Sequence, residues 1–584
     1  DGSGYSSAHT GFPEQVHGKE NTMAYKPLPI GIDDFEKLIS KGYYYVDKTL
    51  LISELLEKKG EVNLFTRPRR FGKSLNLSML RYFFEDAGTE EKNADRRRLF
   101  CGLQIMQAGD AFLSQMNRYP VIQLSLKSAK QPAWELAYGS LKSALEDEYQ
   151  RHMEILPEIP IEADRLRFQR LTERRGTDQD YYTALFFLSR MLHQHYGRPA
   201  VILIDEYDVP LENAYFAGFY QEMTAFIRSL FESALKSNPS LHFAVITGCL
   251  RITKESIFTG LNNLKVNSIL SENYGEYFGF TPAEVERMAA DYGRSTAFPV
   301  IRDWYDGYLF GNKEVFNPWS VLNYVDALTA NPQALPAPYW SNTSSNQIVR
   351  ELIEQADLNV REEIELLITG STIEKPVHEE ITYEDIHESQ DNLWNFLLFT
   401  GYLKQVQRRL DWDTQYCSLA IPNKEVLHIY KSTVTGWFSA NLKKQDLRPL
   451  FHALENGDTE KISEELSRLL QESISFYDYA ENYYHGFLTG VLQNMPGYRI
   501  LSNRESGTGR PDLILKTPGL KGRAILLELK TARSYRDMDS LCDTALSQIR
   551  DRRYREGLQE EGYREVLAYG ICFYQKDCEV KQLF

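Results

Sequence analysis

Residues 23–280 alternate short apolar runs with long stretches of helical periodicity. Four runs are rich in β-branched and aromatic residues, and they lie at residues 61–66, 119–126, 200–206 and 241–248. Each is separated from the next by a segment long enough for one or more helices. This alternation predicts an α/β domain with a parallel sheet that carries helices on both faces.

The pattern changes after residue 280. Residues 281–345 are rich in aromatics and turn-forming residues and are predicted to form a small winged-helix-like region. Residues 346–470 have a helical pattern with an acidic stretch inside it, which predicts a helical connector. The first 22 residues are polar and lack periodicity, so they are interpreted as a disordered tail or the remnant of an expression tag.

Residues 471–584 form a second α/β pattern. A helix is expected at residues 476–495, and a further helix is expected before the last strand. Apolar runs predict strands at residues 498–505, 511–517, 524–531 and 564–574. We therefore expect two separate α/β domains joined by the middle region.

Composition narrows the class of protein. The chain has 42% hydrophobic and 25% charged residues, which is ordinary for a globular protein. Its longest apolar runs are far shorter than the ~20 residues that cross a bilayer, so no membrane association is expected. The six cysteines are scattered without a C-x-x-C pair, which argues against a disulfide framework or a zinc site and suits the cytoplasm. The net charge of −15 is a weak argument against wholesale coating of nucleic acid, but it leaves room for a local basic groove.

The first candidate chemistry follows the run at 61–66. Gly72, Lys73 and Ser74 end a segment that resembles a phosphate-binding loop between a strand and a helix. The helix N-terminus would attract anions, Lys73 would reach the terminal phosphates, and Ser74 would coordinate magnesium. The usual first glycine is missing, because Arg67 stands there and Pro68 follows. The motif alone leaves open a basic turn without a ligand.

Two later strand ends support the nucleotide site. Asp205 and Glu206 end the run at 200–206, where an aspartate would hold Mg²⁺ and a glutamate would orient or activate water. Thr247 ends the run at 241–248 and would sense the γ-phosphate, with Arg251 as a further phosphate contact. Solvated acids at a strand end are the plain alternative.

Several ordered motifs extend this pattern over residues 25–320, among them "RPRRFGKSL", "LIDEYD" and "ITGCLRITKESIFTGLNNLKV". Together they resemble the bacterial AAA-ATPase-like proteins, in which the arginine-rich loop is itself usual. The resemblance implies an ATP-binding core, with Asp47 and Lys48 near the nucleotide. The residues expected at the ATP are Arg69, Arg70, Phe71, Gly72, Lys73, Ser74, Asp205, Thr247 and Arg251.

The C-terminal region carries separate chemistry. Glu528 and Lys530 lie two apart on one strand, so their side chains share a face. A hairpin with the preceding strand can place Asp512 beside Glu528. The two carboxylates would bind Mg²⁺, and Lys530 would orient the nucleophile or stabilise developing charge. A surface strand with an ordinary salt bridge is the plain alternative.

Residues 471–584 resemble the PD-(D/E)XK nuclease superfamily, in which the "PD" and "ELK" elements carry catalysis. The resemblance implies a further acid, Glu481, on the preceding helix. It also implies a Q-x(5)-Y element, Gln548 and Tyr554, on the following helix. His485 could support the same site or pack in the core.

We therefore expect an ATP-binding and ATP-hydrolysing protein with a Mg²⁺-dependent nuclease domain. Nucleic acid is the expected partner, with DNA favoured over RNA, and self-association is left open. ATP would gate cleavage through Arg67, Arg69, Arg70 and Arg251, and the architecture implies defence against mobile elements. The alternative is a nucleotide-switched scaffold or signalling protein whose nuclease fold binds nucleic acid or protein without cutting.

Overall fold

The computed structural model describes residues 25–251, 257–258, 260–340, 358–379, 389–442, 445–471, 481–493, 495–502, 511–519 and 522–584. The predicted tail lies outside these residues. None of the helices in the described ranges combines the length and the apolar character that a membrane span requires.

The N-terminal domain contains a five-stranded parallel sheet with the order β2-β3-β4-β1-β5. Four strands confirm the predicted runs, and β5 adds an edge strand that the apolar pattern did not indicate. All six residues of β3 are buried, as expected for a strand covered on both faces. The strands are β1 (Val62–Thr66), β2 (Val121–Ser125), β3 (Ala200–Asp205), β4 (Leu241–Gly248) and β5 (Leu264–Asn267).

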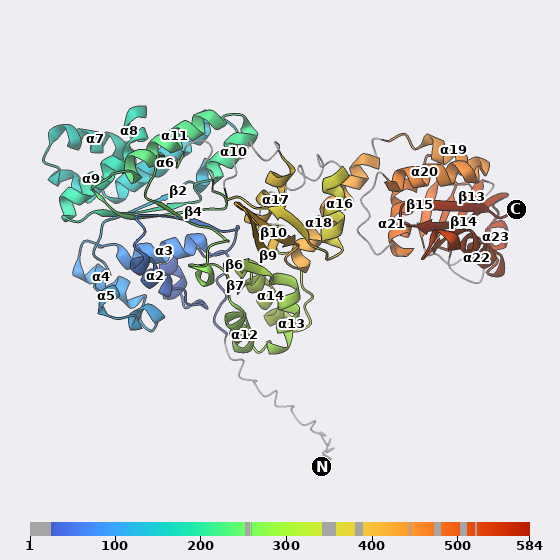
Figure 1. The fold of residues 1–584 in the computed structure, drawn as a ribbon, viewed down its shortest axis with the longest axis horizontal. Coiled ribbons are helices and arrows are strands. Elements are labelled where there is room, and N and C mark those ends of the chain that lie inside the picture. The colour runs from blue at the N-terminus through green and yellow to red at the C-terminus, as the bar shows by residue number, and fades with distance from the viewer. Residues whose placement is uncertain are drawn as a thin grey trace, which may run out of the picture.

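Helices cover both faces of this sheet, as predicted (Figure 1). One face carries α6 (Trp134–Arg151), α7 (Glu162–Thr172), α8 (Asp178–Tyr182), α9 (Ala184–Tyr196), α10 (Val209–Ala217) and α11 (Tyr220–Leu235). The other face carries α2 (Leu50–Lys58), α3 (Lys73–Phe84), α4 (Glu90–Arg98) and α5 (Asp110–Leu113), and α1 (Phe35–Ser40) packs on α3.

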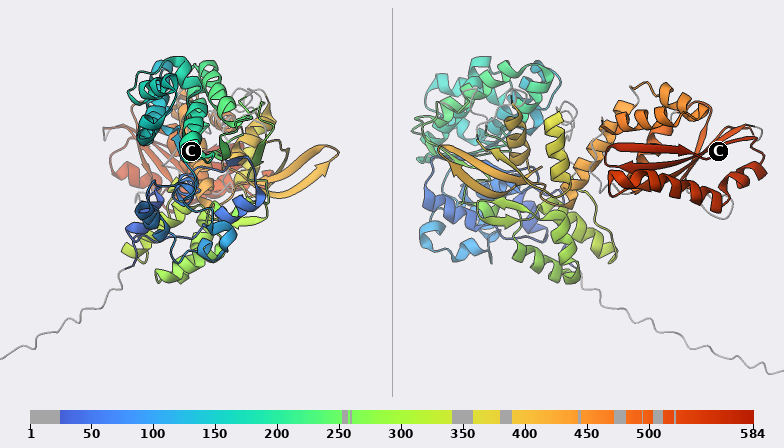
Figure 2. Two further views of the ribbon diagram at one scale, coloured as in Figure 1. Left: turned by 90° about the vertical axis from the view of Figure 1, so that its left-hand side faces the viewer. Right: turned by 45° about the vertical axis from the view of Figure 1, so that its right-hand side comes forward.

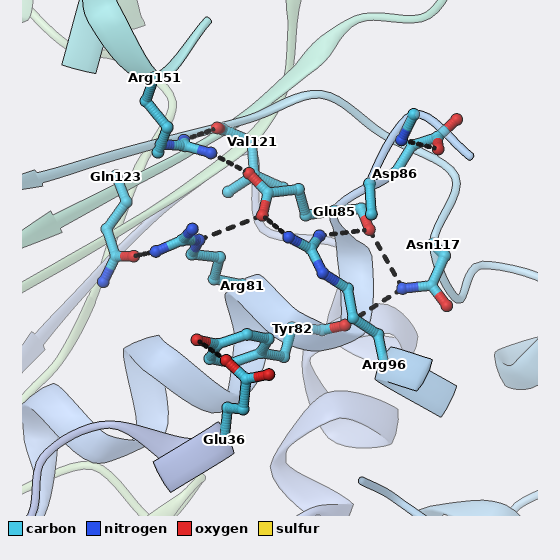
Figure 3. A network of polar contacts seen from close by, with 12 residues as sticks. Glu36, Arg81, Tyr82, Glu85, Asp86, Arg96, Asn117, Val121, Gln123 and Arg151 are labelled. Atoms are coloured by element: carbon cyan, nitrogen blue, oxygen red, sulfur yellow. Dashed lines mark hydrogen bonds and ion pairs between the residues drawn. The ribbon is translucent and has the colours of Figure 1, made fainter. Parts of the chain in front are cut away.

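A buried ionic network anchors the C-terminal end of α3 (Figure 3). Glu85 directly follows the helix, its side chain is 4% exposed, and it pairs with Arg81, Arg96 and Arg151. Arg151 also donates to the backbone oxygen of Val121 at the start of β2. The network therefore joins α3, α4 and α6 to the sheet.

A small module follows the sheet domain. It contains α12 (Pro282–Asp291), α13 (Phe298–Tyr305), a hairpin of β6 (Tyr308–Phe310) and β7 (Lys313–Val315), and α14 (Pro318–Ala330). The three helices share a hydrophobic cluster of their own, whereas Tyr308, Phe310 and Val315 of the hairpin belong to the cluster of the parallel sheet. The hairpin lies between the second and third helices, and the winged-helix-like description of residues 281–345 stays a prediction.

The helical description of residues 346–470 is incomplete. Besides α16 (Leu358–Ile368), α17 (Gln390–Phe399) and α18 (Lys424–Leu442), this region contains a three-stranded antiparallel sheet of β8 (Ile373–Pro376), β9 (Lys404–Asp411) and β10 (Thr414–Ala420). Most of β9 is exposed, so it lacks the apolar alternation that would reveal a strand. The β9–β10 hairpin projects from the molecule (Figure 2).

The middle region also packs against the N-terminal domain. Trp394, Leu397 and Leu419 belong to the same hydrophobic cluster as the parallel sheet. Because these side chains are buried in that shared core, the middle region packs as part of the N-terminal domain.

The C-terminal domain has a mixed five-stranded sheet with the order β11-β12-β13-β14-β15. Four strands confirm the predicted runs, and β15 is an addition. The elements are α19 (Arg448–Asn456), α20 (Thr459–Gln471), α21 (Glu481–Leu492), β11 (Arg499–Ser502), β12 (Leu513–Lys516), β13 (Arg523–Thr531), α22 (Met538–Asp551), α23 (Tyr554–Glu560), β14 (Glu565–Tyr574) and β15 (Asp577–Gln582).

The boundary predicted at residue 471 needs correction. Helices α19 and α20 fall inside the predicted connector, yet their apolar residues share one cluster with α21 and one face of the C-terminal sheet. Helices α22 and α23 cover the other face (Figure 1). The C-terminal domain therefore begins near residue 445.

Candidate functional sites

The loop between β1 and α3 explains the missing glycine. Positive φ values in this loop occur at Arg70 (71°) and at Gly72 (80°), which precedes the first residue of α3. Position 67 does not require the left-handed backbone that glycine adopts easily. Arg67 can therefore replace glycine without straining the loop.

The Arg67 side chain instead packs on the interior side of the loop. It is fully buried, and its guanidinium lies 5.1 Å from the ring centroids of both Phe278 and Phe310. Its Nη1 donates to the backbone oxygens of Thr66 and Asn267. Burial lowers its pKa to about 9, which leaves it charged at neutral pH. This arginine is a packing element beneath the loop.

Residues from three separate segments converge at the carboxyl ends of β3 and β4. The Ser74 hydroxyl donates to Asp205 Oδ2 at 2.6 Å, and the Thr247 hydroxyl donates to Asp205 Oδ1 at 2.5 Å. The ammonium of Lys73 donates to the backbone oxygens of Arg67 and Pro68 at 2.9 Å each. The structure thus brings together the predicted serine, aspartate, threonine and lysine.

Glu206 is held in an unusual backbone conformation. Its φ is 53°, which is rare for a non-glycine residue, and its backbone N–H donates to the Thr247 hydroxyl. Burial and the neighbouring Asp205 carboxylate raise its pKa. A carboxylate with raised proton affinity beside a cavity is suited to accept a proton.

Several of these residues border a cavity of about 400 Å³. Residues 69–76, Lys127, Lys130 and Glu206 line it, together with apolar side chains that include Phe280, Trp319 and Leu322. A lining that combines apolar side chains with a few polar groups is the usual composition of a small-molecule site. The lining also combines the N-terminal segment with α14 of the small module.

The other three predicted arginines each contact a different side chain. Arg69 pairs with Glu212, and the Arg70 guanidinium lies 4.2 Å from the Trp319 ring centroid. Arg251 lies 3.9 Å from Glu379 and, within the described chain, does not line the cavity.

Asp47 and Lys48, expected near the nucleotide, both have partners within the protein. The Asp47 carboxylate accepts hydrogen bonds from Thr49 and from the backbone N–H of Gln104, so its role is structural. Lys48 lines the cavity, but its ammonium donates to Glu284 of α12 at 2.6 Å. It therefore ties the small module to the N-terminal segment.

In the C-terminal domain, the antiparallel pairing of β12 with β13 brings two carboxylates together. The register pairs Leu513 with Leu527, so the next step along the ladder sets Asp512 opposite Glu528. Asp512 Oδ2 accepts a hydrogen bond of 2.8 Å from the Leu529 backbone N–H, which fixes its side chain against β13. The predicted hairpin geometry is confirmed.

Glu528 is the buried member of this pair. It is 1% exposed, and its Oε2 has no hydrogen-bond partner among the described residues. Lys530 Nζ lies 3.5 Å from its Oε1. Burial and the Asp512 charge raise the pKa of Glu528 to about 7, against the opposing effect of Lys530.

The flanking helices contribute further groups. Burial and the charge of Glu528 raise the pKa of Tyr554, against the opposing effect of Gln548, so the predicted Q-x(5)-Y element lies near the two carboxylates. The His485 ring nitrogen Nε2 lies 3.0 Å from the backbone oxygen of Asp512. The side chain of Glu481, which begins α21, lies outside the described residues.

Two segments of the chain match family models. Residues 29–258 match the family model described as predicted AAA-ATPase, and residues 479–583 match that of the PD-(D/E)XK nuclease superfamily. The chain thus carries an AAA-ATPase-like domain and a PD-(D/E)XK nuclease superfamily domain. An uncharacterized protein in the vnfD 5' region of Azotobacter chroococcum mcd 1 is 30% identical over 336 residues. The alignment covers 57% of each protein, so the chain spans a little over half the length of that relative.

The donor sets of both domains fit divalent metal. In the nuclease domain, Asp512 and Glu528 offer hard oxygen ligands, and the unpartnered buried Oε2 of Glu528 needs a cation or a donor. In the AAA-ATPase-like domain, Ser74 and Asp205 would hold the ion. No group of three His, Cys, Asp or Glu side chains suited to a metal occurs within the described ranges, so waters or phosphate oxygens would complete either shell.

Sequence reasoning missed part of the cavity in the AAA-ATPase-like domain. Lys127 and Lys130 line it from the segment after β2, and Pro318 and Trp319 line it from the small module. The two lysines could have been identified from the sequence, because they closely follow a predicted strand of the parallel sheet. The α14 residues had none, since only the tertiary fold brings the module over the loop.

Proposed function

We propose that the AAA-ATPase-like domain binds and hydrolyses ATP with Mg²⁺. The observation that carries this is the convergence of Ser74, Asp205 and Thr247 beside a cavity that Lys73 and Glu206 line. The apolar side chains that line the cavity would contact the base. Magnesium would neutralise phosphate charge at Ser74 and Asp205.

The chain's own residues perform the remaining steps. Lys73 exchanges its two backbone acceptors for phosphate oxygens, and the N-terminus of α3 adds backbone donors. Glu206 accepts a proton from the attacking water. Thr247 fixes Asp205 and the Glu206 backbone through its single hydroxyl.

Calorimetric titration with ATP tests this proposal. Lys73→Ala should lose ATP binding, whereas Glu206→Gln should retain it and hydrolyse ATP ~100-fold more slowly. Lys92→Ala, an exposed substitution on α4, serves as the matched control. ATP binding by Lys73→Ala as tight as that of the parent protein would disprove the assignment.

We propose further that the nuclease domain cleaves phosphodiesters of nucleic acid, with DNA favoured. Asp512 and Glu528 would hold Mg²⁺, which would supply Lewis acidity toward the scissile phosphate. Lys530 would stabilise negative charge at the phosphate, and Gln548 and Glu481 would complete the site. The close approach of Asp512, Glu528 and Lys530 supports this function.

Cleavage of plasmid DNA and of RNA at a fixed free Mg²⁺ concentration tests it. Asp512→Ala and Glu528→Ala should each abolish cutting, and Asp577→Ala, at an exposed position that begins β15, should cut like the parent. Retained cleavage in both site variants would place the activity elsewhere. Metal-dependent binding without any cleavage by the parent would instead favour the scaffold or signalling alternative.

ATP gating of cleavage and a role in defence against mobile elements complete the proposal. Gating requires that ATP binds one domain arrangement more tightly than another. Because Arg67 is buried and Arg69 and Arg251 lie beside acids, Arg70 is the loop arginine best placed to transmit the state of the site. Cleavage rates with ATP, with a non-hydrolysable analogue and without nucleotide should differ by about five-fold or more. Equal rates would exclude gating.

A further inference from the structure

Two lysines that follow β2 are fixed beside the strand end that carries Asp205 and Glu206. The backbone N–H of Leu126 donates to the Asp205 oxygen at 3.1 Å, and Ala129 is fully buried. The backbone oxygen of Gln131 accepts a hydrogen bond of 2.5 Å from Asn213 on α10. The segment is therefore held at both ends, and its exposed residues cannot drift far from the cavity.

Lys127 and Lys130 are exposed residues of this segment, and both line the cavity. Lys127 is close enough to Glu206 to act on its charge, and Lys130 acts likewise on Glu212. Neither ammonium forms an ion pair or hydrogen bond with the residues that the structure describes. Both remain available to a ligand with negative charge.

The other cations near the loop already contact protein groups. Arg67 lies beneath the loop, Arg69 pairs with Glu212, and Arg70 stacks on Trp319. Among the cations of the predicted loop, Lys73 alone would give up only backbone oxygens and a thiol in order to bind phosphate. A triphosphate would thus meet its remaining positive charge on the side of the cavity that Lys127 and Lys130 line.

We propose that Lys127 and Lys130 bind the terminal phosphate of ATP and stabilise its charge during hydrolysis, from within the same chain. This rests on the proposed ATPase function and deepens it. The water oxygen bonds to the γ-phosphorus, and the bond from that phosphorus to the β–γ bridging oxygen breaks. The electron pair leaves with ADP, and the water proton passes to Glu206, so ATP and water give ADP, phosphate and one proton.

The proposal has a consequence for assembly. A cation that contacts the transferred phosphoryl group contributes strongly to the rate, whether it comes from the same chain or from another. With two lysines supplied internally, hydrolysis per chain needs no residue from a second copy. The rate per molecule should then be independent of protein concentration.

Titration calorimetry with ATP and with ADP, both with excess Mg²⁺, tests the first part. All proteins carry Glu206→Gln, so that ATP persists. Adding Lys127→Ala and Lys130→Ala together should weaken ATP binding about tenfold or more and change ADP binding less than about threefold. Lys92→Ala in the same background is the control, and Lys127→Gln with Lys130→Gln replaces the alanines if these impair folding.

Steady-state hydrolysis with Glu206 intact tests the second part. The double substitution should lower kcat ~100-fold, with a smaller change in KM, and Lys127→Arg with Lys130→Arg should restore much of it. An unchanged ratio of ATP to ADP affinity, or a kcat equal to that of the parent, would overturn the proposal while the ATPase assignment stands. A parent protein that binds no ATP would overturn both.

Discussion

At the scale of single residues, Glu148 shows how ionisation supports the fold where the C-terminal end of α3 meets the start of β2. Its carboxylate is buried on α6 and accepts hydrogen bonds from Arg151 and from the backbone N–H of Gln123 in β2. Burial opposes ionisation, but Arg151 and His152 outweigh it and lower the pKa of Glu148 to about 2. Glu85 shares Arg151 with it, and its pKa is lowered in the same way, again against burial (Figure 3).

Replacing Glu148 by Gln should therefore lower the free energy of unfolding at pH 7 by ~3 kcal/mol, because Arg151 loses a buried counterion. The folded pKa lies below the ordinary value of 4.5, so the stabilisation is complete above about pH 4.5 and is lost as the pH falls toward 2. Calorimetric melts should therefore show that the difference in free energy of unfolding between the parent and the variant shrinks as the pH falls from about 4.5 toward 2.

The matched control for this substitution is Glu90→Gln. Glu90 also pairs with an arginine, Arg97, but its side chain is 81% exposed. Its loss should cost less than ~1 kcal/mol. A Glu148→Gln deficit that stays constant from pH 7 to pH 3 would contradict the linkage.

At the scale of elements, the position of α22 depends on a glycine in β14. A Cβ at Gly570 would meet the backbone oxygen of Cys542 at 2.7 Å and the Ala545 side chain at 3.0 Å. Both contacts come from α22, the helix that carries Gln548. Gly570 also pairs with Glu528 in the sheet, so α22 and β13 are fixed relative to each other at this point.

Gly570→Ala should push α22 away from the sheet. We expect a loss of ~1–3 kcal/mol in stability from overpacking and a fall in nuclease activity at temperatures where the variant remains folded. Gly486→Ala on α21, where a Cβ would meet nothing within 4 Å, is the control. Thermal unfolding and cleavage rates give the two readouts, and an unaltered cleavage rate would show that α22 tolerates the shift.

At the scale of the whole molecule, the C-terminal domain includes two helices that precede its family match. Leu450, Leu454, Ile462 and Leu466 of α19 and α20 are at most 2% exposed and pack with the sheet. Each such side chain contributes ~1.5–3 kcal/mol when buried. Their removal would uncover an apolar face of the sheet.

A fragment of residues 445–584 should consequently fold cooperatively and remain monodisperse in size-exclusion chromatography. A fragment of residues 471–584 should aggregate or melt at a much lower temperature. Circular dichroism melts of the two fragments check this, with the intact chain as reference. Equal melting temperatures for both fragments would show that α19 and α20 are dispensable.

The local sequence pattern was sufficient to predict many of the strands and several of the candidate site residues. Continuous apolar runs identify the buried parallel strands, because strands covered on both faces have no polar positions to break the run. Residues that follow such runs lie at one edge of the sheet, which is why Ser74, Asp205 and Thr247 could be grouped from the sequence. The two-residue spacing of Glu528 and Lys530 fixed their common face for a similarly local reason.

Tertiary structure decided the features that depend on distant partners. Arg67 could point to phosphate or into the core, and the rings of Phe278 and Phe310, far along the chain, select the core. The amphipathic pattern of α19 and α20 shows an apolar face but not which surface covers it. Lys127 and Lys130 look like ordinary surface lysines until β2 places them beside Glu206, because the direction of an exposed side chain is set by the fold around it and not by its neighbours in sequence.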